Sequence, residues 1–251
     1  MVNLEMQVTR TPAGLYTIAW RYEFRAPLDI QVGSFPSDNL KVISPSQLAF
    51  AQTNTEDGIF EDRSRTTADV IYDPRNNQFI IFPEGTIRDL VGINNIVDAH
   101  RGRVRFFGRV SFFRKEKEFI VPKNQRERVY DVADTMLRKG TAVAVGPGEQ
   151  NVDTSRFGDE GLTRILYSNE SMGFRTEDYG RFLKDKKGIN VQSFFLDDEN
   201  YAKYQKGPYV NGLRVDTPST GFRVRGDQAL HLNSGAFGVR FEKTAEISSK
   251  K

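Results

Sequence analysis

The sequence of 251 residues contains no cysteine, which excludes disulfides, thiol catalysis and cysteine-ligated zinc. Its only two histidines, His100 and His231, are too far apart to resemble a pair of metal ligands, so we expect structural or surface roles for both. No apolar run approaches the roughly 20 residues that span a bilayer. The first residues, MVNLEMQVTR, lack the basic and apolar regions of a signal peptide. We therefore expect no contact with a membrane, and a location in the cytoplasm or in a virion.

Signatures of enzymes are also scarce. The motifs GxxxxGK[ST], HExxH and GxSxG are absent, and Gly146-Pro147-Gly148 lacks the lysine and further glycines of a phosphate-binding loop. Asp185-Lys186-Lys187 matches half of a nuclease motif, but lysines at a helix end are expected because they complement the helix dipole. The acidic run Asp197-Asp198-Glu199 offers oxygen ligands to a divalent cation, although a solvated loop explains it more simply. The sequence favours a protein without catalytic residues, metal or cofactor, and a hydrolase or nuclease is only the third hypothesis.

What the sequence has in quantity is aromatic residues: 19 Phe and 9 Tyr, in a chain that is 38% hydrophobic and 27% charged. These proportions are typical of a globular protein, and aromatic side chains favour strands. The length suffices for one large domain or two small ones. We expect a single globular unit over residues 1–251. The alternative is a subdivision near residue 120 into a β-rich half, 1–120, and an α+β half, 121–251.

Several segments alternate polar and apolar residues, as half-buried strands do. In Leu15–Phe24 the larger and more apolar set starts at Tyr16 and is expected to face the core. Thr66–Tyr72 and Gln78–Phe82 flank the sequence DPRNN, which has the composition of a hairpin loop. The strands predicted near the C-terminus are 213–216, 222–225, 229–233 and 237–242, with Gly226-Asp227 and Ser234-Gly235 as turns.

Two main helices are expected, near residues 125–139 and 177–187. The first has Asn124 as its expected N-cap, Gly140 as its C′ residue and an apolar stripe formed by Val129, Val132, Ala133, Met136 and Leu137. The second has Thr176 as its expected cap and a stripe formed by Tyr179, Phe182 and Leu183.

Between these helices, Thr141–Val145 has the composition of a buried strand. Asp89–Ala99 stays open between a short helix and a buried loop, because its periodicity favours neither. Taken together, the pattern predicts a β-rich α+β fold built on antiparallel sheets, arranged as a sandwich or as the sheet of an RNA-recognition motif.

Charge is unevenly distributed along the chain, whose net charge is only +3. Residues 1–100 carry 8 basic and 13 acidic side chains, a balance of −5. Residues 101–128, called the basic window below, carry 10 basic and 3 acidic side chains, a balance of +7. A concentration of one sign indicates contact with an anionic partner, which is either a nucleic acid or the acidic first hundred residues of this chain or of another copy.

Within the basic window, the segment RGRVRFFGRVSFFRKEKEF at residues 101–119 keeps a period of two. One face carries Val104, Phe106, Gly108, Val110 and Phe112, and the other carries Arg103, Arg105, Phe107, Arg109, Ser111 and Phe113. Compared with the signature strand of the RNA-recognition motif, Arg105–Phe112 satisfies the basic, aromatic, small, valine and final aromatic positions. It departs from that signature at Phe106 and Arg109, so the family is not inferred.

The chemistry of this face does not depend on that family. Arginines that alternate with exposed rings can hold phosphates while the rings stack bases. Two further arginines in the first turn of the first helix oppose its dipole, which indicates a nearby anion. The nucleic-acid-binding residues expected from the sequence are Arg103, Arg105, Phe107, Arg109, Phe113, Lys115, Arg126 and Arg128.

Near the C-terminus, GFRVRG at residues 221–226 repeats the pattern of arginines opposite apolar residues. The leading hypothesis is a non-enzymatic subunit that binds single-stranded RNA or DNA within a larger assembly. The alternative is a structural subunit of a phage or virus particle, in which the basic window docks on the acidic half of a neighbouring copy.

Overall fold

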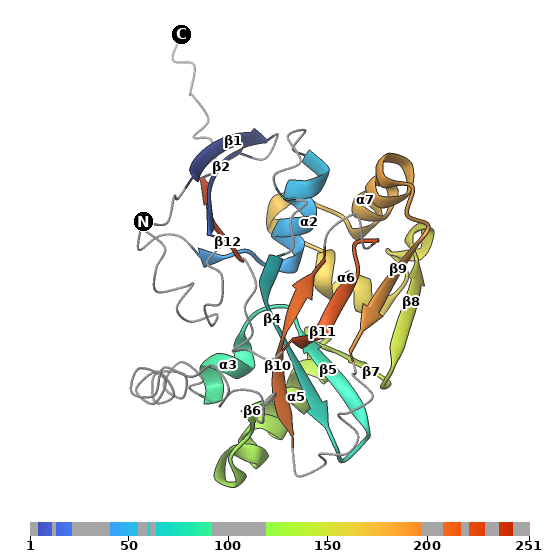
Figure 1. Cartoon of the computed structure of the whole chain (residues 1–251). Helices are drawn as coiled ribbons and strands as arrows, with labels where there is room; N and C mark the ends of the chain where they lie inside the picture. The colour runs from blue at the N-terminus through green and yellow to red at the C-terminus, as the bar shows by residue number, and fades with distance from the viewer. Residues whose placement is uncertain are drawn as a thin grey trace, which may run out of the picture.

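The computed structural model describes residues 5–11, 14–21, 41–54, 60, 64–91, 119–196, 208–216, 221–228 and 236–242 (Figure 1). Twelve strands form one sheet. They are β1 (Glu5–Thr11), β2 (Gly14–Arg21), β3 (Lys41–Val42), β4 (Ser64–Asp73), β5 (Gln78–Phe82), β6 (Phe119–Ile120), β7 (Val143–Val145), β8 (Glu149–Asp153), β9 (Val191–Phe195), β10 (Tyr209–Val215), β11 (Val224–Gln228) and β12 (Ala236–Glu242). The helices are α2 (Pro45–Asn54), α3 (Thr86–Val91), α5 (Arg126–Lys139), α6 (Gly161–Tyr167) and α7 (Thr176–Arg181).

The sheet is mixed. Its main path is β1-β2-β12-β4-β10-β11-β9-β8, and β5 and β7 extend it from β4. Most neighbours are antiparallel, but β12 runs parallel to β4 and β11 runs parallel to β9. Strands β9 and β11 can run parallel because the chain returns between them through β10, which is antiparallel to β11. The prediction of a β-rich α+β fold is confirmed, with a mixed sheet in place of the expected antiparallel ones. The sandwich and the RNA-recognition-motif sheet stay predictions.

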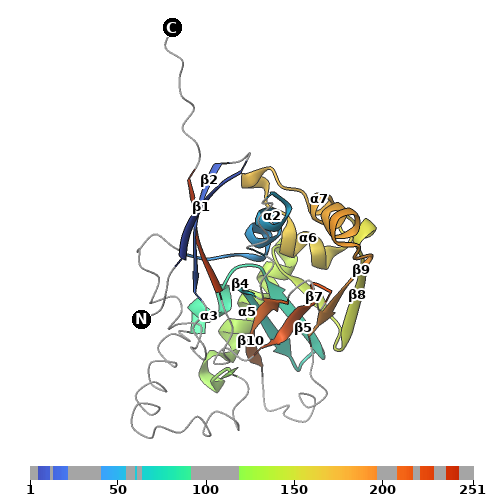
Figure 2. The same cartoon turned by 45° about the horizontal axis from the view of Figure 1, so that its top comes forward.

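The central strands are buried on both faces because each face packs against helices. Phe79 and Ile81 of β5 belong to the larger core, together with α2, α6 and α7, which Figure 2 shows side by side. Ile80 and Phe82 belong to a second core under α3 and α5. Strand β10 contributes to both cores and is buried along its whole length. Burying each of these side chains contributes roughly 1.5–3 kcal/mol.

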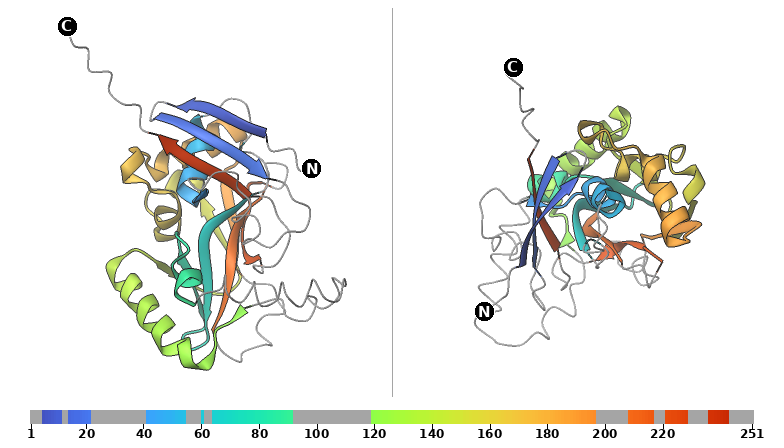
Figure 3. Two further views of the ribbon diagram at one scale, coloured as in Figure 1. Left: turned by 90° about the vertical axis from the view of Figure 1, so that its left-hand side faces the viewer. Right: turned by 90° about the horizontal axis from the view of Figure 1, so that it is seen from above.

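Strands from both sides of residue 120 lie in this one sheet. Strand β10 pairs with β4, and β12 pairs with β2 to continue the ribbon that β1 and β2 form (Figure 3). The subdivision near residue 120 stays a prediction. Strand β2 confirms the strand predicted in Leu15–Phe24. Which of its side chains face the core stays a prediction, because these side chains are not among those described. No helix in the described part of the chain is both long and apolar enough to cross a membrane.

The predicted hairpin is confirmed: β4 and β5 pair antiparallel, with Asp73 opposite Gln78. Asn77 takes a left-handed φ of 48°, a conformation that asparagine tolerates in tight turns. The Asp73 side chain is fully buried and accepts hydrogen bonds from the backbone N–H of Arg75 at 2.9 Å and from the amide of Asn76 at 3.2 Å. The short helix α3 begins at Thr86, before the segment that the sequence left open, reaches into it at Asp89 and is described as far as Val91.

Helix α5 confirms the first predicted helix, except at its start. Val129 and Ala133 are buried, and Val132, Met136 and Leu137 pack against the same core. Gly140 ends the helix at φ 68° and donates its N–H to the Leu137 carbonyl, as predicted. The N-cap is Gln125 and not Asn124, because Pro122 starts a 3-10 turn over Lys123–Gln125 that keeps Asn124 from the extended conformation of a cap.

The second predicted helix is divided into α7 and a π-helical turn over Phe182–Lys186. Tyr179 and Leu183 are buried and Phe182 is half-buried, so the predicted stripe is confirmed. The expected cap Thr176 is instead the first helical residue, and it is buried against the core, with Arg175 at the N-cap position.

One short prediction is confirmed only in part, and another is wrong. Thr141–Val145 forms strand β7 only from Val143, and this strand is half-exposed because it pairs with β5 alone among the described strands. Gly226-Asp227 is not a turn but lies within β11, where the register against β10 shifts between Arg225 and Gln228. A β-bulge uses the same small and polar residues as a turn, which explains the misreading. The strand predicted at 229–233 and the turn Ser234-Gly235 lie outside the described residues.

Candidate nucleic-acid interface

The side of the sheet formed by β11, β9 and β8 has one covered face and one open face. Phe194 and Leu196 point into the core, whereas Val191 is 47% exposed and Phe195 is half-buried on the opposite face. We call this opposite face of β9 and β11 the outer strip, and it is formed by Val191, Ser193, Phe195, Arg223 and Arg225.

The chain enters β11 through a strained turn. Gly221 and Phe222 both have positive φ, 77° and 50°, and the second value is unusual for a residue with a side chain. The strain is offset because the Phe222 ring is completely buried and its carbonyl accepts a hydrogen bond of 2.8 Å from the Gln192 amide. This turn places Phe222 inside the core and Arg223 on the outer strip. It confirms the expected division between the arginines and the apolar residues of GFRVRG.

An aromatic ring and an arginine guanidinium meet on the outer strip, and a second arginine extends from the same face. The guanidinium carbon of Arg223 lies over the Phe195 ring, 5.4 Å from its centroid. Arg225 is the residue directly opposite Phe195 in the register of β11 and β9, so it extends from the same face. Arg223 is exposed and Arg225 is half-buried. A nucleic-acid base can stack on this ring when the guanidinium turns from it to a phosphate.

Acidic residues limit the outer strip on the side of β8. Glu149 lies opposite Phe195, and Asp153 lies opposite Val191. The Asp153 carboxylate accepts hydrogen bonds from the hydroxyl and the backbone N–H of Ser155, at 2.6 and 2.8 Å, and these bonds hold the pKa of Asp153 below its usual 3.8. The positive part of this face therefore lies over β11 and not over β8.

Most of the residues expected from the sequence, Arg103, Arg105, Phe107, Arg109, Phe113 and Lys115, lie outside the described residues. The described end of the basic window is attached to the sheet: Phe119 pairs with Val210, and the N–H of Val121 donates to the Pro208 carbonyl at 2.8 Å. The window therefore leads directly into the start of α5, where Arg126 and Arg128 lie.

Arg126 and Arg128 differ in their environment. Arg126 is half-buried, and its Nε donates to the Val121 carbonyl at 3.1 Å. A backbone carbonyl thus takes one of its donors, and this bond holds the start of the helix to the preceding strand. Arg128 is exposed, as are Lys123 and Glu127. Arg128 is therefore the more accessible of these two arginines.

The buried polar side chains near the outer strip serve the core. Tyr167 donates to Gln192 at 2.8 Å and Tyr179 donates to Gln52 at 2.7 Å, and the two rings lie 4.7 Å apart. Burial raises the pKa of both tyrosines well above the usual 10. Both hydroxyls therefore stay protonated near neutral pH, and this network gives the core hydrogen bonds without supplying a general base.

The described residues contain no group of three His, Asp or Glu side chains that fits a metal ion. Asp185, Lys186 and Lys187 lie at the end of the π-helical turn and beyond it, where lysines were expected. His100, His231 and the run 197–199 lie outside the described residues. No protein-family model, curated protein or solved structure matches the chain.

Sequence reasoning missed Phe195, the ring of the outer strip. The segment Val191–Phe195 does not alternate clearly, because Gln192 is buried while Val191 is exposed. The available signal was GFRVRG, whose alternation predicts a strand with its arginines on one face. The sequence does not reveal that the neighbour of this strand is β9.

Proposed function

We propose that the protein is a non-enzymatic subunit that binds single-stranded nucleic acid, RNA or DNA, within a larger assembly in the cytoplasm or in a virion. The observation that carries the proposal is the outer strip, where Arg223 lies over Phe195 and Arg225 extends from the same face. Charge in the sequence supports it independently, because the basic window holds a balance of +7 in residues 101–128.

The two regions have complementary tasks in this proposal. The outer strip stacks bases on Phe195 and contacts the backbone through Arg223 and Arg225. The basic window supplies further phosphate contacts and two more rings, through Arg103, Arg105, Phe107, Arg109, Phe113, Lys115, Arg126 and Arg128. Because every base has a π-face, such a surface binds with little sequence preference and with a strong dependence on salt.

Paired variants of two neighbouring phenylalanines test the outer strip. Phe195→Leu keeps an apolar side chain and removes the ring, so it should weaken binding of a labelled single-stranded oligonucleotide by roughly 1–3 kcal/mol, which is the contribution of one stacked base. Phe194→Leu changes the buried neighbour, so it should lower the free energy of unfolding by up to about 1.5 kcal/mol and leave affinity unchanged. Fluorescence anisotropy and urea unfolding measure the two quantities. Equal affinity of Phe195→Leu and the wild type would contradict the proposal.

A structural subunit of a phage or virus particle is the second candidate. It is favoured by the charge contrast between residues 1–100, at −5, and the basic window. A contact between these regions of two copies is heterologous and generates rings or filaments. Light scattering at low salt, before and after nuclease treatment, separates the two candidates, because only assembly through nucleic acid is lost after nuclease.

A further inference from the structure

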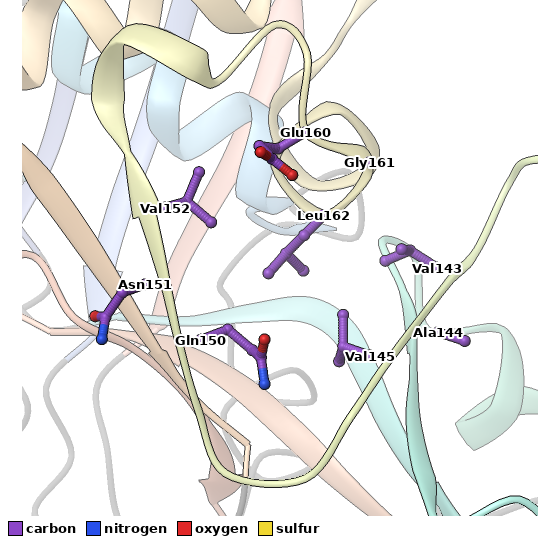
Figure 4. Close-up of a pocket in the computed structure, with 9 residues that line it drawn as sticks. All are labelled: Val143, Ala144, Val145, Gln150, Asn151, Val152, Glu160, Gly161 and Leu162. Carbon is purple, nitrogen blue, oxygen red and sulfur yellow. The ribbon is translucent and has the colours of Figure 1, made fainter.

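Strands β7 and β8 follow one another in the sequence without pairing. Among the described strands, β7 pairs with β5 alone and β8 with β9 alone, so each has one edge without a neighbouring strand. Both edges line one pocket of about 280 Å³, together with the start of α6 (Figure 4). We propose that this groove, called the seam below, accepts an extended basic strand of a partner protein. This inference goes beyond the proposed nucleic-acid binding and does not depend on it.

The topology brings two edge strands to the seam. From β7 to β8 the sheet passes through β5, β4, β10, β11 and β9, a path of seven strands whose two ends meet at the pocket. Following the pairings along this path, β7 and β8 run in opposite directions. An inserted strand therefore lies antiparallel to one of them and parallel to the other. Edge strands with unpaired N–H and C=O groups are the usual site at which a sheet gains a strand from a partner.

The connection between the strands keeps them apart. Residues 146–148 form a turn in which Pro147 has no N–H to donate and Gly148 has a φ of 96°. The Gln150 side-chain amide donates to the Gly146 carbonyl at 3.3 Å, which braces the turn from within. Figure 4 shows β7 and β8 separating from this turn toward α6.

The lining of the seam defines the chemistry of its occupant. Val143, Val145, Val152 and Leu162 give the groove an apolar wall on which alternate side chains of a strand can pack. On the other face of β8, Glu149 and Asp153 would neighbour the alternate side chains of a strand added beside it, whereas Glu160 in the lining is already paired with Arg156 at 2.6 Å. A strand with alternating basic and apolar residues matches both features, whereas the phosphates of a nucleic acid would be repelled.

A peptide with a modified backbone tests the proposal on the full-length protein. An eleven-residue peptide of alternating lysine and valine should bind, and its binding should protect the amides of Val143–Val145 and Gln150–Val152 from hydrogen exchange. The same peptide with alternate amides N-methylated keeps its side chains but loses half of its backbone donors, so it should bind at least about tenfold more weakly. Equal binding of the two peptides, or binding without protection of these amides, would overturn the proposal. So would the absence of binding by either peptide.

A plug at Gly161 locates the peptide. Gly161 is exposed, has no positive φ, and an added Cβ would meet only the Val143 methyl at 3.8 Å, so a larger side chain is tolerated and extends into the groove. Gly161→Phe should abolish peptide binding, while Gly161→Ala should bind as the wild type does. Thermal unfolding of both variants checks that the fold is kept. Equal peptide binding by Gly161→Phe and the wild type would overturn the proposal.

Charge and self-association complete the test. Glu149→Lys, on the edge strand β8, should weaken peptide binding about tenfold, whereas Glu170→Lys, an exposed acid outside the lining, should have no effect. Equal loss in both variants would show that the peptide responds to overall charge and would overturn the assignment to the seam. If concentrated protein alone dimerises with protection of the same amides, the occupant is a second copy, and the partner-protein proposal fails.

Discussion

The guanidinium of Arg75 lies over the ring of Tyr130, with its central carbon 3.7 Å from the ring centroid. Arg75 comes from the turn between β4 and β5, and Tyr130 comes from α5, so this contact joins the hairpin to the helix. Asp73 and Asp134 hold the same guanidinium at 2.9 and 3.1 Å. Hydrogen bonds to Asp73 and then to Asp134 raise the pKa of Arg75 above its usual value, so this side chain is a permanent cation.

Removing this cation should weaken the attachment of α5. In Arg75→Ala, the fully buried Asp73 keeps only the hydrogen bonds from the backbone N–H of this position and from the Asn76 amide. We therefore expect a loss of about 1–3 kcal/mol in the free energy of unfolding. Arg75→Lys keeps the charge but loses the planar fork, and should fall between alanine and the wild type. Urea unfolding measures the differences. Arg138→Ala, at the exposed end of α5, serves as the control and should change stability by about 0.5 kcal/mol or less.

The contrast between Arg75 and the hairpin that carries it illustrates what the sequence could predict. Alternation over Thr66–Tyr72 and Gln78–Phe82 and the loop DPRNN were enough to predict the hairpin, because local preferences determine it. The contact with Tyr130, 55 positions further along the chain, follows from the packing of α5, which no local pattern encodes. Both helices were likewise predicted from their apolar stripes, while both of their N-caps were wrong, since Pro122 and the burial of Thr176 changed the first turns.

Gly226 should not tolerate a side chain. A Cβ at this position would lie 2.9 Å from a Leu196 methyl and 3.0 Å from a Val70 methyl, both of them buried. Gly226→Ala is therefore expected to reduce the free energy of unfolding by about 1–3 kcal/mol through overpacking. Gly146→Ala is the matched control, because nothing lies within 4 Å of its added Cβ. Thermal and urea unfolding compare the two, and similar stabilities would show that β11 can move away from β4 and β9.

Asp153 should contribute to stability only while it is ionised. The Ser155 hydroxyl and backbone N–H donate to its carboxylate and lower its pKa in the folded protein below the usual 3.8. The contribution is therefore complete above pH 3.8 and is lost as the pH falls through the folded-state pKa. Ser155→Ala removes the hydroxyl bond and should raise this pKa toward 3.8. Carbon-13 NMR titration of the carboxyl group measures it, and an unchanged midpoint in the variant would contradict the assignment.

The candidate interface was only partly accessible to sequence reasoning. The arginines of GFRVRG were assigned to one face, and Arg223 and Val224 lie on opposite faces as expected. Phe195 could not be assigned with them, because it lies 28 positions before Arg223, on a strand that pairs in parallel with β11. Arg126 was expected to meet an anion, which stays a prediction, and its Nε donates to a backbone carbonyl that is close in sequence. A charge pattern identifies which residues are basic, but not which of their donors the fold already uses.

The salt dependence of binding separates phosphate contacts from stacking. Six cations are expected to contact phosphates in the basic window: Arg103, Arg105, Arg109, Lys115, Arg126 and Arg128. On a single strand each contact contributes about −0.7 to the slope of log K against log[salt], so these six contribute about −4, and Arg223 and Arg225 on the outer strip add about −1.4. Changing the first three arginines to Gln should make the slope less steep by about 2.

Phe195→Leu should lower affinity at every salt concentration without changing the slope, because stacking releases no counterions. Arg138→Gln, at the far end of α5, is the control for a loss of charge alone. A wild-type slope near zero would rule out the basic window as a phosphate-binding surface, and a triple variant with the wild-type slope would assign the contacts to other cations.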